Sequence, residues 1–339
     1  MYYQFRNDYS ELVSPEILRF IEEIALEQNV GYGLDKHSVE AEKLILEKFG
    51  LDNGAVFFML GGTQVNMVTL SYLLRPYEGV IACDTAHING HETGAVEGSG
   101  HKIYTSKNVD GKITPEDIRR CVRLNHDCHT VKFTTVYISN ATESGTIYTK
   151  DELLALRKVC DELGLFLFMD GARMGVALTS RKNDVDCKLI GEVCDAFYIS
   201  GTKNGMLSGE ALCFKNKKVA EDFRYQIKNK GGMLAKGFLV SSQFECAFRD
   251  DLFFRLAKNS NDQADYIKDS LKGVCEFTNE SPTNQIFLRF KKADAEKIME
   301  NFGAEPWEDQ GEHMVIRLVT SFNTKKEDCD KIIEFIKGL

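Results

Sequence analysis

Short apolar runs alternate along much of the chain with longer segments whose apolar residues recur at helical spacing. The runs predict buried strands at 54–60, 79–83, 102–106, 133–140, 166–170, 195–200 and 211–214. Several of the longer segments begin with helix-capping residues, as at Thr114-Pro115 and in the capping box of Thr149 and Glu152. Buried strands separated by amphipathic helices are typical of a largely parallel sheet that helices cover on both faces. The pattern therefore predicts a large α/β domain over residues 15–235.

A different pattern follows in the C-terminal part of the chain. One helical stretch covers about Leu234–Leu271, and strands and helices then alternate at 284–290, 293–302, 313–320 and 325–337. This order indicates a smaller α+β domain. We expect residues 1–14 and 236–339 to form it, together with the helix that connects it to the large domain.

Composition and charge restrict the kinds of partner. The 339 residues are 43% hydrophobic and 27% charged, which is typical of a globular protein. A net charge of −9 argues against non-specific binding to nucleic acid or to an anionic membrane. The N-terminus lacks the pattern of a secretory signal, and no apolar stretch approaches the roughly 20 residues that cross a bilayer. We therefore expect a soluble cytoplasmic protein, whose ten cysteines, without a CxxC pair, are reduced.

Two of the predicted strands lead to residues of opposite charge. Asp170 ends the strand at 166–170, and Lys203 follows the strand at 195–200. Open α/β sheets bind their ligands at the carboxyl ends of strands, so both side chains are expected at one edge. Pyridoxal 5'-phosphate needs an amine with which it forms an imine and a carboxylate that keeps its pyridine nitrogen protonated. The pair therefore predicts a pyridoxal-phosphate site, with Lys203 as the Schiff base and Asp170 at the ring nitrogen.

Two further features fit this cofactor. The turn Leu60-Gly61-Gly62-Thr63-Gln64 joins a strand to a helix, where backbone N–H groups and a hydroxyl group can hold a phosphate at the positive end of the helix dipole. His87 follows another strand and can stack on an aromatic ring. Each feature alone is weak, because a glycine turn before a helix is usually only a turn and most lysines are solvated. Their order along the chain carries the prediction.

This order resembles that of the low-specificity L-threonine aldolases and related β-eliminating lyases, which are pyridoxal-phosphate enzymes with the aspartate aminotransferase fold (fold type I). The resemblance runs from Arg6 to Ser321 and includes the motif Asp170-Gly171-Ala172-Arg173. It implies that the cofactor-binding residues are Gly62, Thr63, His87, Asn140, Asp170, Arg173, Thr202 and Lys203.

The resemblance also implies a reaction, the retro-aldol cleavage of threonine or allo-threonine to glycine and an aldehyde. The implied catalytic residues are Lys203, His87 and Glu92, and the implied substrate-binding residues are Asn7, Arg173 and Arg317. The two arginines suit an amino acid, because a planar guanidinium group binds a carboxylate through two parallel hydrogen bonds. Enzymes of this fold usually place the active site at a subunit interface, so a homodimer or homotetramer is expected.

The chain departs from the family after its central strand. The family commonly has Glu-Asn-Thr-His there, whereas this chain has Ser139-Asn140-Ala141-Thr142, so that Thr142 stands at the position of the histidine. Threonine cannot act as a base near neutral pH. The base is therefore open among His87, Glu92, His91 and a bound water. The departure also leaves β-elimination, racemisation or transamination in the same fold as the alternative.

Three other functions are less consistent with the sequence. A non-catalytic scaffold would not need both Asp170 and Lys203, and a nicotinamide-dependent oxidoreductase would need a GxGxxG turn that residues 61–66 do not supply. His87 and His91 have the spacing of two metal ligands on a helix, but Gly90 weakens a helix there. The polar segment 126–129, which contains two histidines, is expected to be a solvated loop. We therefore expect no metal.

Overall fold

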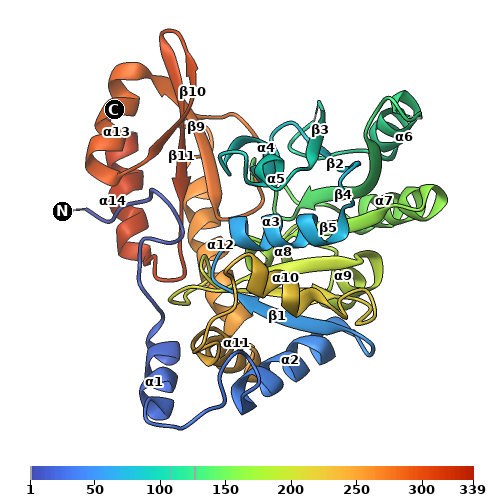
Figure 1. Ribbon diagram of the computed structural model, residues 1–339. Helices are drawn as coiled ribbons and strands as arrows, with labels where there is room; N and C mark the ends of the chain where they lie inside the picture. Colours follow the sequence, from blue (N-terminus) through green and yellow to red (C-terminus); the bar gives the residue numbers. More distant parts are fainter. Residues whose placement is uncertain (1, 108, 126) are drawn as a thin grey trace.

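The computed structural model describes residues 2–107, 109–125 and 127–339, so one histidine of the 126–129 segment lies outside the described residues. A seven-stranded sheet forms the centre of the large domain, in the order β1-β7-β6-β5-β4-β2-β3 (Figure 1). Strand β7 runs antiparallel to both of its neighbours, and the other paired strands run parallel. The predicted, largely parallel sheet is confirmed. Its strands are β1 Ala55–Met59, β2 Glu78–Cys83, β3 Lys102–Ser106, β4 Lys132–Ser139, β5 Phe166–Asp170, β6 Ala196–Ser200 and β7 Glu210–Phe214.

Helices cover both faces of this sheet, as the alternation of its side chains requires. In β5, Leu167 and Met169 join one apolar cluster and Phe168 joins the other. Helices α1 (Pro15–Ile24), α2 (Lys36–Phe49), α6 (Pro115–Leu124), α7 (Lys150–Leu163) and α9 (Cys187–Val193) contribute to the first cluster. Helices α3 (Gly62–Leu73), α4 (His87–Gly90), α5 (Ala95–Gly98) and α10 (Phe223–Asn229) contribute to the second.

The predicted small domain contains a second, antiparallel sheet, in the order β10-β11-β9-β8. Its elements are β8 Glu276–Phe277, β9 Gln285–Lys291, α13 Lys292–Phe302, β10 Glu305–Gln310, β11 His313–Val319 and α14 Lys326–Lys337. Strand β10 was not predicted, because its sequence is mostly polar and it lies exposed at the edge of the sheet. The N-terminal segment joins this domain, since the Phe5 amide donates to the Phe302 carbonyl at 2.7 Å.

The predicted helical stretch at 234–271 contains two helices in the structure. Helix α11 (Phe238–Arg249) ends before Asp251, whose φ of +54° lies in the left-handed region, and α12 (Leu252–Leu271) begins after it. Helix α11 packs against α1 and α2, whereas the C-terminal half of α12 belongs to the core of the small domain. In Figure 1, α12 lies between the two sheets. The domain limits at residues 14/15 and 235/236 stay a prediction.

Candidate active site

The carboxyl ends of the central strands and the start of α3 enclose a cavity of about 300 Å³. An outer cavity of about 540 Å³ adjoins it and reaches β10 and β11 of the small domain. Seven of the predicted site residues line the inner cavity, namely Gly62, Thr63, His87, Asp170, Arg173, Thr202 and Lys203. Arg317 lines the outer one, together with His91, Glu305 and Trp307. Tyr9, His87, Glu143, Arg173 and Lys203 line both. The fold thus brings most of the predicted site together.

Asp170, at the end of β5, is held in one orientation. Its Oδ2 accepts hydrogen bonds from the Tyr137 hydroxyl at 2.5 Å and from Asn66 Nδ2 at 3.1 Å. Gly171 allows the next turn to lie against β6, since a Cβ there would be 1.8 Å from the Tyr198 carbonyl oxygen. The carboxylate is therefore fixed on the cavity before any ligand arrives.

Lys203 follows β6 in a turn that Thr202 stabilises. The Thr202 hydroxyl donates to Glu210 Oε1 at 2.9 Å and accepts from the Gly209 amide at 3.0 Å. Burial, followed by the charge of Arg173, lowers the pKa of Lys203, although nearby carboxylates act in the opposite direction. A lowered pKa favours the neutral amine, which is the form that attacks a carbonyl group.

The N-terminus of α3 offers backbone donors to an anion. Helix α3 begins at Gly62, and Gly61 before it provides no side-chain cap. The first amides of a helix lack partners within the helix, and the dipole favours a negative charge there. The backbone at Gly62 lies close to β6, because a Cβ would be 2.9 Å from the Tyr198 hydroxyl. A phosphate group would fit at this turn.

His87 is connected to Asp170 through buried side chains. Its Nδ1 lies 2.8 Å from Glu92 Oε1, and the same oxygen accepts from Asn66 Nδ2 at 2.7 Å. Asn66 Nδ2 in turn lies 3.1 Å from the Asp170 carboxylate. Burial lowers the pKa of His87, but the hydrogen bond to Glu92 and the charge of Asp170 outweigh it, so the pKa is raised. His87 therefore holds a proton more strongly than an ordinary histidine does.

Both arginines of the predicted clamp face the outer cavity, and each has a carboxylate partner. Arg173 binds Asp8 through two hydrogen bonds, of 2.9 and 3.0 Å. Arg317 Nη2 lies 2.5 Å from Glu305, and its guanidinium group lies 5.3 Å from the Trp307 ring. Burial, followed by the charge of Arg173, lowers the pKa of Arg317. Two guanidinium groups close enough to affect each other suit an anionic ligand.

Three predicted residues lie outside both cavities. Asn7 caps its own turn, because its Oδ1 accepts from the Tyr9 amide at 3.0 Å. Asn140 is buried and does not line the inner cavity, and its Oδ1 accepts from the Tyr148 amide at 3.2 Å. Glu92 lines neither cavity and reaches the site only through His87, whose Nδ1 lies 2.8 Å from Glu92 Oε1. The roles assigned to Asn7, Asn140 and Glu92 stay predictions.

Thr142, the residue at the family histidine position, points away from the site. It is fully buried, and its hydroxyl lies 2.7 Å from Thr146 Oγ1. The next residue, Glu143, lines both cavities instead. Burial raises the pKa of Glu143, although the Ser139 hydroxyl, which donates to it at 2.8 Å, acts in the opposite direction. Glu143 was not among the predicted site residues, and the available signal was an acid four residues after the end of β4.

A second acid on the cavity was also missed. Glu210, the first residue of β7, is buried beside Lys203 and accepts from Thr202. Burial raises the pKa of Glu210 to about 8. Its position after a glycine, at the start of an apolar run, was the available signal, because a carboxylate that begins a buried strand needs a local reason.

Comparison with known families matches nearly the whole chain to one of them. A family model described as beta-eliminating lyase matches residues 4–314, which include the residues of both cavities except Arg317. The chain belongs to the beta-eliminating lyase family. The family predicted from the order of the motifs is thereby confirmed.

Relatives in the family match this chain over most of its length. A low specificity L-threonine aldolase from a Pseudomonas species is 32% identical over 308 residues, covering 87% of this chain and 86% of the relative. Another from Saccharomyces cerevisiae is 26% identical over 281 residues, covering 80% of this chain and 70% of the relative. The chain therefore spans most of these relatives.

Solved structures confirm the predicted fold type I. A Leishmania major threonine aldolase superposes with a TM-score of 0.97 at 39% identity and covers 99% of both chains. A Thermus thermophilus aspartate aminotransferase superposes with a TM-score of 0.74 at 15% identity, covering 99% of this chain and 91% of that chain. At such low identity the aminotransferase shows the fold alone.

Proposed function

We propose that this protein uses pyridoxal 5'-phosphate to cleave a β-hydroxy-α-amino acid, such as threonine or allo-threonine, to glycine and an aldehyde. The observation that carries the proposal is that Lys203 and Asp170 share one cavity, which opens beside Arg173 and Arg317. The relatives with the higher sequence identities are threonine aldolases. The alternative, β-elimination, racemisation or transamination, is not favoured, because the aminotransferase likeness extends to the fold only.

The residues of the inner cavity fit this cofactor. Lys203 would bind it covalently, and the oriented Asp170 carboxylate would pair with its ring nitrogen. The uncapped turn of Gly62 and Thr63 would hold its phosphate, with Thr202 beside it. His87 would lie over the ring. Once bound, the cofactor withdraws electrons from the α-carbon of the substrate.

The outer cavity would bind and orient the substrate. Arg173 and Arg317 would hold the α-carboxylate, and the pairing of Arg173 with Asp8 restricts where its guanidinium group lies. Orientation matters because the bond that breaks must stand perpendicular to the plane of the cofactor ring. A two-arginine clamp can thereby select cleavage of the Cα–Cβ bond.

Proton transfer completes the proposed role of the chain. The lowered pKa of Lys203 suits an amine that delivers a proton to Cα when glycine forms. Glu92 would hold His87 in one orientation through its Nδ1, so that the imidazole stays in place over the cofactor ring. These are the catalytic roles that we assign to Lys203, His87 and Glu92.

The test is turnover of L-allo-threonine and L-threonine by the purified protein with pyridoxal 5'-phosphate, followed by release of glycine and acetaldehyde. Lys203→Ala is the control, and we expect it to abolish turnover because no other cavity residue supplies the amine. If the wild-type protein binds the cofactor but leaves both substrates intact, the proposed cleavage is wrong. One of the alternative reactions would then be expected.

We also propose that the protein forms a homodimer or homotetramer in the cytoplasm. Large apolar side chains are exposed around α1, α2 and α11, which pack together, and subunit contacts would bury them. They are Leu18, Leu26, Val30, Leu34, Val39 and Leu239. Sedimentation of the wild type and of Leu26→Glu would test the assembly. Within the described part of the chain, no helix has the length and apolarity to span a bilayer.

A further inference from the structure

Breaking the Cα–Cβ bond of a β-hydroxy amino acid requires an acceptor for the hydroxyl proton. As the O–H bond breaks, its electrons form the C=O bond of the aldehyde, and the electron pair of the Cα–Cβ bond passes to Cα. We propose that Oε2 of Glu143 accepts this proton. Lys203 would then give a proton to Cα to form glycine, and Glu143 would release its proton to solvent, from which Lys203 is protonated again. The inference rests on the proposed cleavage.

The contacts of Glu143 leave one oxygen available. Oε1 accepts from the Ser139 hydroxyl at 2.8 Å and from the His87 amide at 3.0 Å. Oε2 is buried and has no hydrogen-bond partner among the described residues. A buried carboxylate oxygen without a partner is unusual, because desolvation without a hydrogen bond costs free energy. A substrate hydroxyl group would supply the missing donor.

The position of Glu143 matches the place where that hydroxyl group is needed. Glu143 lines both the inner cavity, with Lys203, and the outer cavity, with Arg317. A substrate joined to the cofactor at Lys203 and held by its carboxylate at the clamp would lie across this boundary. The Ser139 and His87 contacts to Oε1 keep the carboxyl group from turning away.

The environment also makes Glu143 a better base than an ordinary glutamate. Burial raises its pKa, and the charge of Asp170 acts in the same direction, whereas the hydrogen bonds from Ser139 and from the His87 amide lower it. A base is most effective when its pKa approaches the working pH. The basic side chains that share one or both of its cavities are Arg173, Lys203, His87, His91 and Arg317.

The other candidates are less well placed. His87 already engages Glu92 through Nδ1, and Glu92 itself lines neither cavity. His91 lies at the outer cavity only, on the exposed side. Tyr9 lines both cavities, but a phenol is a poor proton acceptor in its usual protonated form. Glu143 is the carboxylate among the residues that line both.

The experiment compares Glu143→Gln with the wild-type holoenzyme. Gln keeps the shape of the side chain but cannot accept the proton, so we expect cleavage of L-allo-threonine to fall about 10²- to 10⁴-fold. The dissociation constants for the cofactor and for glycine should change by no more than about twofold. Exchange of the glycine α-proton with deuterated water should also persist, because it needs no hydroxyl acceptor.

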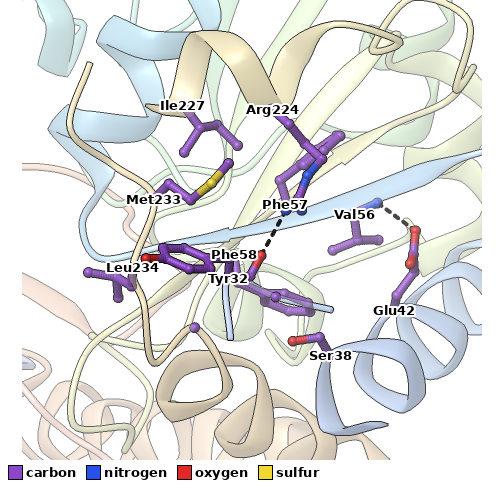
Figure 2. A pocket seen from close by; sticks show the side chains of 12 residues that line it. Tyr32, Ser38, Glu42, Val56, Phe57, Phe58, Arg224, Ile227, Met233 and Leu234 are labelled. Atoms are coloured by element: carbon purple, nitrogen blue, oxygen red, sulfur yellow. Dashed lines mark hydrogen bonds between the residues drawn. The ribbon is translucent and has the colours of Figure 1, made fainter. Parts of the chain in front are cut away.

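Glu42→Gln is the matched control. Burial also raises the pKa of Glu42, and its carboxylate accepts from the Val56 amide at 3.1 Å. It lies, however, in a separate cavity of about 60 Å³, beside Ser38 and Phe58 (Figure 2). This variant should retain wild-type cleavage. Glu143→Asp, which keeps the carboxylate on a shorter arm, should cleave faster than Glu143→Ala, and this comparison applies even if the Gln variant fails to fold.

The outcomes separate this inference from the proposed function. Normal cleavage by Glu143→Gln would overturn the role of Glu143. If Glu143→Gln loses cleavage, glycine exchange and cofactor affinity alike, the role of Glu143 is structural and the inference is also overturned. If the wild-type protein does not cleave at all, or Lys203→Ala cleaves normally, the proposed function itself is wrong.

Discussion

Arg173 and Asp8 form a two-point ion pair, with Nε to Oδ2 at 2.9 Å and Nη2 to Oδ1 at 3.0 Å. Asn284 of the small domain also donates to Asp8, at 3.0 Å. Burial acts to raise the pKa of Asp8, but the charge of Arg173 holds it below its ordinary value. The N-terminal segment thereby orients the arginine that is expected to bind the substrate carboxylate.

Replacing Asp8 should therefore impair substrate binding. In Asp8→Asn the guanidinium group loses a charged partner and its fixed direction, so we expect kcat/KM to fall about 10- to 100-fold, or roughly 1.4–2.8 kcal/mol. Steady-state kinetics would measure the change. Asp309→Asn, which removes an exposed ion pair with Lys292, is the control and should behave as the wild type. An unchanged kcat/KM in Asp8→Asn would show that Arg173 does not need its partner.

Glu210 should make the stability of the cofactor-free protein depend on pH. Its pKa is raised by burial from an ordinary 4.5 to about 8, so between these values the folded state binds the proton that the unfolded state has lost. The free energy of unfolding therefore falls as pH rises through this window. Glu210→Gln resembles the protonated form, and its Tm should increasingly exceed that of the wild type from pH 5 towards about pH 8. A constant difference would contradict the ionisation of a buried Glu210.

Glu92 should control the protonation of His87. Because the hydrogen bond to Glu92 is the largest effect that raises the pKa of His87, Glu92→Gln should lower that pKa. Titration of the His87 ring protons by NMR in the wild type and in Glu92→Gln would measure the shift. The same His87 pKa in both proteins would rule out this coupling.

Gly171 should tolerate no side chain. A Cβ at this position would lie 1.8 Å from the Tyr198 carbonyl oxygen, which forces β5 and β6 apart at the end that holds Asp170. Gly171→Ala should lower the free energy of unfolding by about 1–3 kcal/mol and weaken cofactor binding. Denaturant unfolding would measure it, with Gly98→Ala as a control, because no atom lies within 4 Å of a Cβ there. Equal stability of the two variants would contradict the tight packing.

The sequence by itself determined the order of most elements and the strand ends at which Asp170 and Lys203 lie. Buried strands have a short apolar pattern, and the carboxyl ends of parallel strands meet at one edge. From these two rules alone, Asp170 and Lys203 could be placed on one cavity. The exposed, polar strand β10 and the break at Asp251 escaped prediction, because neither produces an apolar periodicity.

Only the tertiary structure decided which charged groups meet. Asp8 pairs with Arg173 across 165 positions of sequence, and Arg317 reaches the outer cavity from another domain. In the folded chain, the Thr142 hydroxyl contacts Thr146 outside the site, whereas Glu143 lines both cavities. The physical reason is that ion pairing and proton affinity depend on distance and on exclusion of water, which spacing along the chain does not specify.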